Sequence, residues 1–127
     1  MTTCLHFRLQ TGAYTLPLSR VYRVAAFAVL TGAPDEYFAG WLPFYGRMMP
    51  VFDLNRVVCE VSTPEDFGSR IMLVEAPPGA PVPCIGLLAP AVTQTVDSAT
   101  PDTTPLDLDL YLQMLSNFIP PVLESAR

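Results

Sequence analysis

The sequence predicts an all-β fold of two small β-barrels that share an interface, followed by one helix near the carboxyl end. Two observations support this prediction. Many short apolar runs follow one another, punctuated by 7 glycines and 14 prolines, and they do not alternate with the crossover helices of a parallel sheet. Half of the 127 residues are apolar, which is enough to form a core without disulfides or a metal. We therefore predict a single domain over residues 1–127.

The first segment has the pattern of a β-hairpin. Apolar and polar residues alternate over residues 5–10, which is the period of a half-buried strand. Thr11-Gly12-Ala13 interrupts the alternation, and an extended pattern resumes over residues 14–24. On this alternation Cys4 and His6 point outward, away from the face that carries Leu5, Phe7 and Leu9.

Residues 34–40 are predicted to form one or two helical turns. Pro34 comes early, Asp35 and Glu36 lie in the first turn, and Gly40 stands at the end. This is the order in which these residue types occur along short helices.

The central region, residues 37–58, predicts two strands of a tight barrel and a short helix. Gly40 and Gly46 flank an apolar and aromatic run, and they supply the backbone freedom that a corner or a hairpin needs. Residues 48–52 form the second strand, and Asp53 is placed to cap the helix that follows. The apolar residues of that helix are Leu54, Val57 and Val58.

Two further strands are predicted after this helix. Residues 62–68 form a polar loop and residues 70–75 a strand. A proline-rich turn over residues 77–83 then leads into a strand over residues 83–88. The two strands are expected to pair with each other across that turn.

The carboxyl-terminal segment allows two interpretations. Thr104-Pro105-Leu106-Asp107 has the form of a helix start, with a capping hydroxyl, a proline and an acid. Residues 106–112 also alternate as a short strand would. Under either interpretation we predict a helix from about Asp109, ended by Pro120 and Pro121. The apolar residues that share its buried face are Leu108, Tyr111, Leu112, Leu115 and Ile119.

The charge pattern excludes several classes of protein. The net charge is -5, and all seven basic residues are arginine. Without lysine there can be no P-loop lysine, no Schiff base and no lysine-rich membrane patch, and an acidic chain is a poor nucleic-acid binder. The apolar run near residues 84–92 is broken by Gly86 and Pro90 and is too short to span a bilayer. The amino terminus lacks the pattern of a secretory signal, so we expect no membrane insertion.

The three cysteines indicate a reduced, cytoplasmic setting. Cys4, Cys59 and Cys84 lie far apart and form no C-x-x-C pair. Cys59 and Cys84 stand in apolar surroundings, which predicts that they are core residues behaving as small hydrophobic groups.

No group of residues indicates catalysis. His6 is the only histidine, and the sequence places no further metal ligands near it. The adjacent acids at 35–36 and 65–66 are explained by solvated loops or a helix start. Neither G-x-S-x-G nor G-x-G-x-x-G occurs. We therefore predict a protein that is not an enzyme and holds no metal or cofactor.

Several segments follow one another in an order that is informative as a whole. They are Tyr14-Thr15-Leu16-Pro17-Leu18-Ser19-Arg20-Val21-Tyr22-Arg23-Val24, Gly40, Pro43-Phe44-Tyr45-Gly46, Pro50-Val51-Phe52-Asp53-Leu54, Cys84-Ile85-Gly86-Leu87-Leu88, and the spaced Val92 and Val96. This order resembles the CheW family of adaptors in bacterial chemosensory arrays, whose signature is an Asn-Leu-Arg-Gly turn followed by Pro-Val-x-Asp-Leu. The resemblance covers residues 5–98, whereas segment 99–127 diverges and is predicted to be largely helical.

The resemblance implies two SH3-like barrels packed together and a non-catalytic scaffold role in chemotaxis signal transduction. Family members bridge a CheA-type histidine kinase to chemoreceptors through barrel surfaces and the groove between the barrels. Carried over position by position, the partner-binding residues here are Val21, Arg23, Gly40 and Tyr45. Tyr45 is the expected aromatic anchor of that protein-protein contact.

The chain also departs from the family pattern. Tyr45 replaces the arginine of the turn, and Arg23 replaces a glutamate. Arg23 could stack on Tyr45 as a cation on an aromatic face, or the surface could have lost recognition of an ordinary receptor. The part after Ser98 is short, so we expect an uncovered barrel edge that a partner or a second copy covers.

Two alternative functions remain open at the level of sequence. A CheW-like module could serve another pathway, such as pilus motility or second-messenger control. A small β-barrel enzyme or ligand-binding protein could use an aromatic pocket near Trp41.

Overall fold

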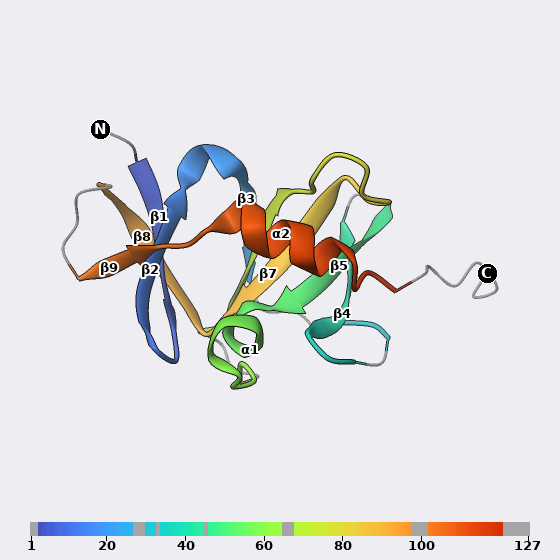
Figure 1. Ribbon diagram of the computed structural model, residues 1–127, viewed down its shortest axis with the longest axis horizontal. Coiled ribbons are helices and arrows are strands. Elements are labelled where there is room, and N and C mark those ends of the chain that lie inside the picture. The colour runs from blue at the N-terminus through green and yellow to red at the C-terminus, as the bar shows by residue number, and fades with distance from the viewer. Residues whose placement is uncertain are drawn as a thin grey trace.

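In the computed structural model the chain forms two β-sheets and a carboxyl-terminal helix (Figure 1). The structure describes residues 3–26, 30–32, 34–44, 46–64, 68–97 and 102–120. The strands are β1 (Thr3–Leu9), β2 (Gly12–Pro17), β3 (Val21–Ala26), β4 (Phe38–Phe44), β5 (Arg47–Asp53), β6 (Arg70–Glu75), β7 (Cys84–Ala89), β8 (Ala91–Asp97) and β9 (Thr103–Pro105). The helices are the 3-10 turn η1 (Leu18–Arg20), α1 (Leu54–Cys59) and α2 (Leu108–Ser116).

The strands divide into two sheets that lie at opposite ends of the view in Figure 1. Sheet A has the order β8-β1-β2-β9, and sheet B has the order β3-β6-β7-β5-β4. The pairs β2–β9 and β5–β7 are parallel, and the other pairs are antiparallel. The turn η1 connects the two sheets. The predicted fold class, mainly β with a carboxyl-terminal helix, is confirmed.

The main core lies between the two sheets and α2. It contains residues of sheet A such as Phe7, residues of sheet B such as Phe52, and three leucines of α2. A second cluster, on the other face of sheet B, includes Val51 and Ile71. Strand β6 sends alternate residues to the two clusters and is therefore buried on both faces. The α2 leucines are Leu108, Leu112 and Leu115, and with half-buried Tyr111 they confirm the predicted helix face. Ile119 also packs against the core, but it lies beyond α2, which ends at Ser116 and not, as predicted, at Pro120.

Several predicted elements form as expected. Residues 70–75 are a strand, and they pair antiparallel with β7 (Cys84–Ala89), the strand predicted over residues 83–88. Asp53 caps α1 by accepting a hydrogen bond from the Arg56 backbone N–H at 3.3 Å. In the tail, the helix predicted from about Asp109 is confirmed as α2, which Asp107 caps. Neither interpretation of the preceding residues holds, because the short strand β9 ends at Pro105, before the alternating residues 106–112, and Thr104 lies in β9 rather than capping the helix.

The helix predicted over residues 34–40 is wrong. Asp35 and Phe38 bond to each other through their backbones, with N···O distances of 3.0 and 2.6 Å, and so form a tight turn. Phe38 to Gly40 already belong to β4. The proline, acid and glycine signals suit a turn as well as a helix. As part of strand β4, Phe38 packs its aromatic ring edge-on against Phe52 in the core.

The predicted outward orientation of Cys4 is also wrong, because Cys4 is only 6% exposed. Alternation places it on the opposite face of β1 from Leu5, but β1 is an inner strand between β8 and β2. An inner strand can be covered on both faces. The alternation along β1 therefore shows which residues share a face, but it does not show that either face is exposed to solvent. His6 is half-buried rather than exposed.

An ion pair joins η1 to α2. The Arg20 guanidinium donates to the Asp109 carboxylate at 2.7 Å. This hydrogen bond, together with the arginine charge, lowers the pKa of Asp109. The hydrogen bond to Asp109 is likewise the main reason that the pKa of Arg20 is raised. The pair fixes the first turn of α2 against the connection between the sheets.

Close packing at Gly86 gives a first prediction. A Cβ at this position would lie 2.9 Å from the Cγ2 atoms of both Ile71 and Val51. We expect Gly86→Ala to lower the free energy of unfolding by about 1–3 kcal/mol, measured by urea denaturation. Val51→Ala makes room for the added methyl group, so the double variant should lose less than the sum of the single losses. Strict additivity would contradict this packing account.

The ion pair predicts a pH dependence. The carboxylate of Asp109 has a lowered pKa in the folded state, so its contribution to stability is present above about pH 4 and is lost as pH falls through the folded pKa. Asp109→Asn should therefore be less stable than the wild type at pH 7, and the difference should shrink as the pH falls below about 4. Arg20→Gln should remove the same pH-dependent difference in thermal unfolding. A gap between Asp109→Asn and wild type that stays constant as the pH falls would point to another cause.

Candidate protein-interaction site

Two of the predicted partner-binding residues lie on β3, an edge strand of sheet B. Val21 is half-buried and packs against the main core. Arg23 is exposed and stands opposite Leu73 of β6. Of these two, the side chain of Arg23 is therefore the one that a partner can reach.

A third predicted residue, Gly40, belongs to β4 of the β4–β5 hairpin. Gly40 is buried in β4 with a φ of +144°. A Cβ there would lie 2.6 Å from the Leu30 Cβ and 3.0 Å from the Thr31 carbonyl oxygen, so Gly40 lets segment 30–32 pack against β4. Tyr45 lies outside the described residues.

Arg23 and Gly40 occupy the two outer strands of sheet B. Register pairs connect them in one row across the sheet, through Leu73, Gly86 and Val51. Residues of both outer strands, Ala25 of β3 and Phe44 of β4 among them, pack against the second core cluster. The sheet therefore curls so that its two edges border the same cluster. Among the described residues, Val21, Arg23 and Gly40 therefore lie on the two outer strands of one curled sheet.

The sequence prediction missed Tyr22 and Val24. Tyr22 is 64% exposed and Val24 is 37% exposed. The pairing of β3 with β6 shifts register between Val21 and Arg23, so Tyr22 is the extra residue of a β-bulge, and bulges re-aim side chains. We name Val21, Tyr22, Arg23 and Val24 the β3 surface. An exposed aromatic ring beside a cation is typical of protein interfaces.

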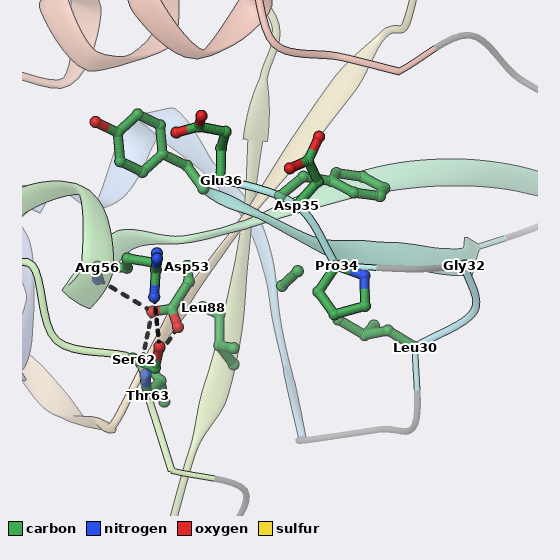
Figure 2. Close-up of a pocket in the computed structure, with 13 residues that line it drawn as sticks. Leu30, Gly32, Pro34, Asp35, Glu36, Asp53, Arg56, Ser62, Thr63 and Leu88 are labelled. Atoms are coloured by element: carbon green, nitrogen blue, oxygen red, sulfur yellow. Dashed lines mark hydrogen bonds between the residues drawn. The ribbon is translucent and has the colours of Figure 1, made fainter.

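A groove of about 560 Å³ opens on another side of sheet B. Figure 2 shows its two walls: Leu30 and Pro34 on one side, and Asp53, Arg56 and the Ser62–Thr63 loop on the other. Leu88 lies between the walls. The turn at residues 35–37 forms one end of the groove. Apolar and polar groups thus face each other across this space.

On the wall of the groove that carries Asp53, the polar groups already bond to one another. The buried Asp53 carboxylate accepts from the Thr63 backbone N–H at 2.7 Å and from the Thr63 hydroxyl at 2.6 Å, in addition to Arg56 N–H. The Arg56 guanidinium donates to the Ser62 hydroxyl at 3.0 Å. This network ties the loop after α1 to the end of β5. The role of Asp53 is therefore structural, because its carboxylate holds α1 and the loop at Thr63 in place.

The thiol of Cys84 does not have the lowered pKa of an activated cysteine. Burial raises the pKa of Cys84, and the nearby charge of Glu75 raises it further, so the thiol stays protonated. Cys84 is buried, as predicted, whereas Cys59 is only half-buried, with its sulfur 3.1 Å from the Thr11 hydroxyl. No cluster of three or more potential metal ligands occurs among the described residues.

Within the same described residues, no helix has the length and apolar character needed to cross a membrane. The longest, α2, has nine residues.

Comparison with known proteins identifies the fold. No protein-family model matches the sequence, and no curated protein matches it closely enough to show a relationship. Among solved structures, the scaffolding protein TtCheW from Thermoanaerobacter tengcongensis superposes with a TM-score of 0.64 and 25% sequence identity. The match covers 75% of this chain and 64% of the TtCheW chain. The chain therefore has a CheW-like fold, which confirms the resemblance seen in the sequence.

The Asp53 network gives a third prediction. Asp53→Ala removes the cap of α1 and leaves the Thr63 donors without their acceptor, so we expect a loss of about 2–4 kcal/mol in the free energy of unfolding. The matched control is Asp35→Ala, which removes a carboxylate from the exposed end of the same groove and should change stability by about 0.5 kcal/mol or less. Both are measured by urea denaturation. Equal losses would show that groove charge, rather than the network, carries the effect.

Proposed function

We propose that this chain is a non-catalytic adaptor in bacterial chemosensory signalling. It couples a CheA-type histidine kinase to chemoreceptors by protein-protein contacts, and it works in the cytoplasm, where its three cysteines stay reduced. The observation that carries this proposal is the fold shared with the scaffolding protein TtCheW.

The surface described above supports a role in binding. Tyr22 and Arg23 stand next to each other on an edge strand, where a partner can approach them without disturbing the core. Aromatic and arginine side chains provide most hot spots of protein interfaces. We assign partner binding to the β3 surface together with Tyr45, and we assign Gly40 the packing of segment 30–32 against β4.

The groove does not favour the ligand-binding alternative. Its volume suits a small molecule, but the Asp53 carboxylate and Arg56 guanidinium bond within the chain. A polar ligand would have to displace those bonds. Use in another pathway, such as pilus motility, keeps the same surface and differs in the partner that it binds.

A pull-down with matched variants tests the proposal. The tagged protein and its Tyr45→Ala and Arg23→Glu variants are incubated with purified CheA-type kinase and receptor signalling domain from the same cell. We expect the wild type to retain one or both partners and each variant to retain at least tenfold less, because loss of a hot spot costs about 2 kcal/mol or more.

The control for this experiment is Val61→Ala. Val61 is an exposed apolar residue beyond α1, and α1 follows the end of β5 remote from residue 45. A strand of that length spans about 20 Å, so Val61→Ala should retain wild-type binding. Thermal unfolding of each variant checks that the fold persists. If the wild type retains neither the kinase nor the receptor, the chemosensory assignment fails.

A further inference from the structure

One flank of α2 leaves a row of apolar side chains open to solvent. Leu110 is 60% exposed and Phe118 is 42% exposed, and Met114 between them is half-buried. Phe118 continues the row past the end of α2, because its N–H donates to the Leu115 carbonyl at 2.8 Å. We name Leu110, Met114 and Phe118 the α2 stripe. Side chains spaced by four residues form a ridge on a helix, and such ridges pack into the groove of a second helix.

Carboxylates stand at both ends of the α2 stripe. Asp107 is exposed in the turn at its amino end. At the other end the Phe118 ring packs edge-on against Tyr37, with 5.5 Å between the ring centroids. This contact brings the exposed residues Asp35 and Glu36 beside the stripe, and Figure 2 shows both carboxylates on the same side of their turn. Among the described residues, none of these three carboxylates takes part in an ion pair.

The arginine that contacts α2 does not neutralise these carboxylates. Arg20 pairs with Asp109, which precedes Leu110 by one residue and therefore faces another side of the helix. Gln113 lies four residues after Asp109 and shares that side with it. The α2 stripe is thus apolar along its length and negative at both ends.

These charges disfavour two of the surfaces that could cover an apolar stripe. A second copy of the chain would bring carboxylates against carboxylates, whether the two helices ran parallel or antiparallel. Helices that lie on membranes carry lysine and arginine beside their apolar face, and the membrane surface is itself negative. The complement of the α2 stripe is an apolar surface with a positive charge at each end.

We propose that the α2 stripe binds an amphipathic helix of a partner protein, with arginine or lysine at both ends of its apolar row. The apolar row packs against Leu110, Met114 and Phe118, and the basic ends approach Asp107 and the turn at residues 35–36. Residues 107 and 118 are separated by about 16 Å along a helix, so the basic residues of the partner stand about 11 positions apart.

This inference does not rest on the adaptor role. The α2 stripe lies outside residues 5–98, the segment that resembles the CheW family, and it shares no residue with the β3 surface. A single helix on a short stripe falls in the lower range of interface areas, below about 1,200 Å². We therefore expect a dissociation constant on the order of 10 µM or weaker.

A library of helical peptides provides the probe. Phage display presents amphipathic helices of about 15 residues that share a leucine row and vary freely at both ends. Selection on the wild-type protein should enrich arginine and lysine at the two ends of the row. The most enriched peptide is then synthesised, and its dissociation constant is measured by fluorescence anisotropy. Failure to enrich any peptide, or enrichment of neutral or acidic ends, overturns the proposal.

Two alanine variants of α2 form a matched pair. Leu110→Ala removes the most exposed side chain of the stripe and should weaken peptide binding at least fivefold. Gln113→Ala changes an exposed residue on the other side of the same helix and should bind like the wild type. Alanine favours helices, so both variants should keep the fold, which thermal unfolding checks. Equal binding by the wild type and Leu110→Ala contradicts the proposal.

The charges at residues 35 and 36 are tested through salt. The double variant Asp35→Asn/Glu36→Gln should bind the peptide more weakly than the wild type at low salt, and its affinity should fall less as salt is added. An unchanged affinity and salt dependence would show that these carboxylates do not face the partner, which overturns the charge-based assignment.

Two measurements without peptide test the other occupants. Co-sedimentation with vesicles of phosphatidylserine and phosphatidylcholine tests for a membrane, and sedimentation velocity tests for a second copy. We expect neither association to depend on Leu110. Association that Leu110→Ala abolishes, in either measurement, would assign the stripe to that occupant and overturn the proposal. None of these experiments contains a kinase or a receptor, so their failure is distinct from failure of the adaptor assignment.

Discussion

The packing of α2 into the core between the two sheets is the interaction on which the rest of the structure depends. Leu108, Leu112 and Leu115 are buried among residues of both sheets, and full burial of a leucine contributes about 2 kcal/mol. The position of the helix is set by β9, whose pairing with β2 ends just before the Asp107 cap. A short strand and a helix thus close the core on the side where sheet A has its shortest strand.

Local signals predicted the elements that depend on local causes. The apolar run of β6 and the cap at Asp53 both act over a few residues, and both form as expected. The prediction of a helix over residues 34–40 was wrong because proline, acids and glycine fit turns and helix ends alike, and only pairing with β5 decides between them. The predicted exposure of Cys4 was wrong for a related reason, since the number of covered faces of β1 depends on strands that are distant in the sequence.

The candidate site was predictable only in part, and the reason is geometric. The order of the segments that resemble the CheW family indicated that β3 and the β4–β5 hairpin carry the contact residues. The structure places these elements along the two edges of a single curled sheet. The exposure of Tyr22 results from a register shift between β3 and β6. No local pattern reveals such a shift, because it is a property of two paired strands. The buried state of Gly40 likewise depends on segment 30–32 packing against it.

The distribution of buried strands explains why contact surfaces should lie at strand edges and hairpin ends. Both β6 and β7 are buried along nearly their whole length, so sheet B has no free face at its centre to offer a partner. A substitution there would act on packing, as the close contacts at Gly86 show. Residues on β3 carry no such constraint on their outer side. The residues on the sheet edges can therefore vary with little effect on the packing of the core.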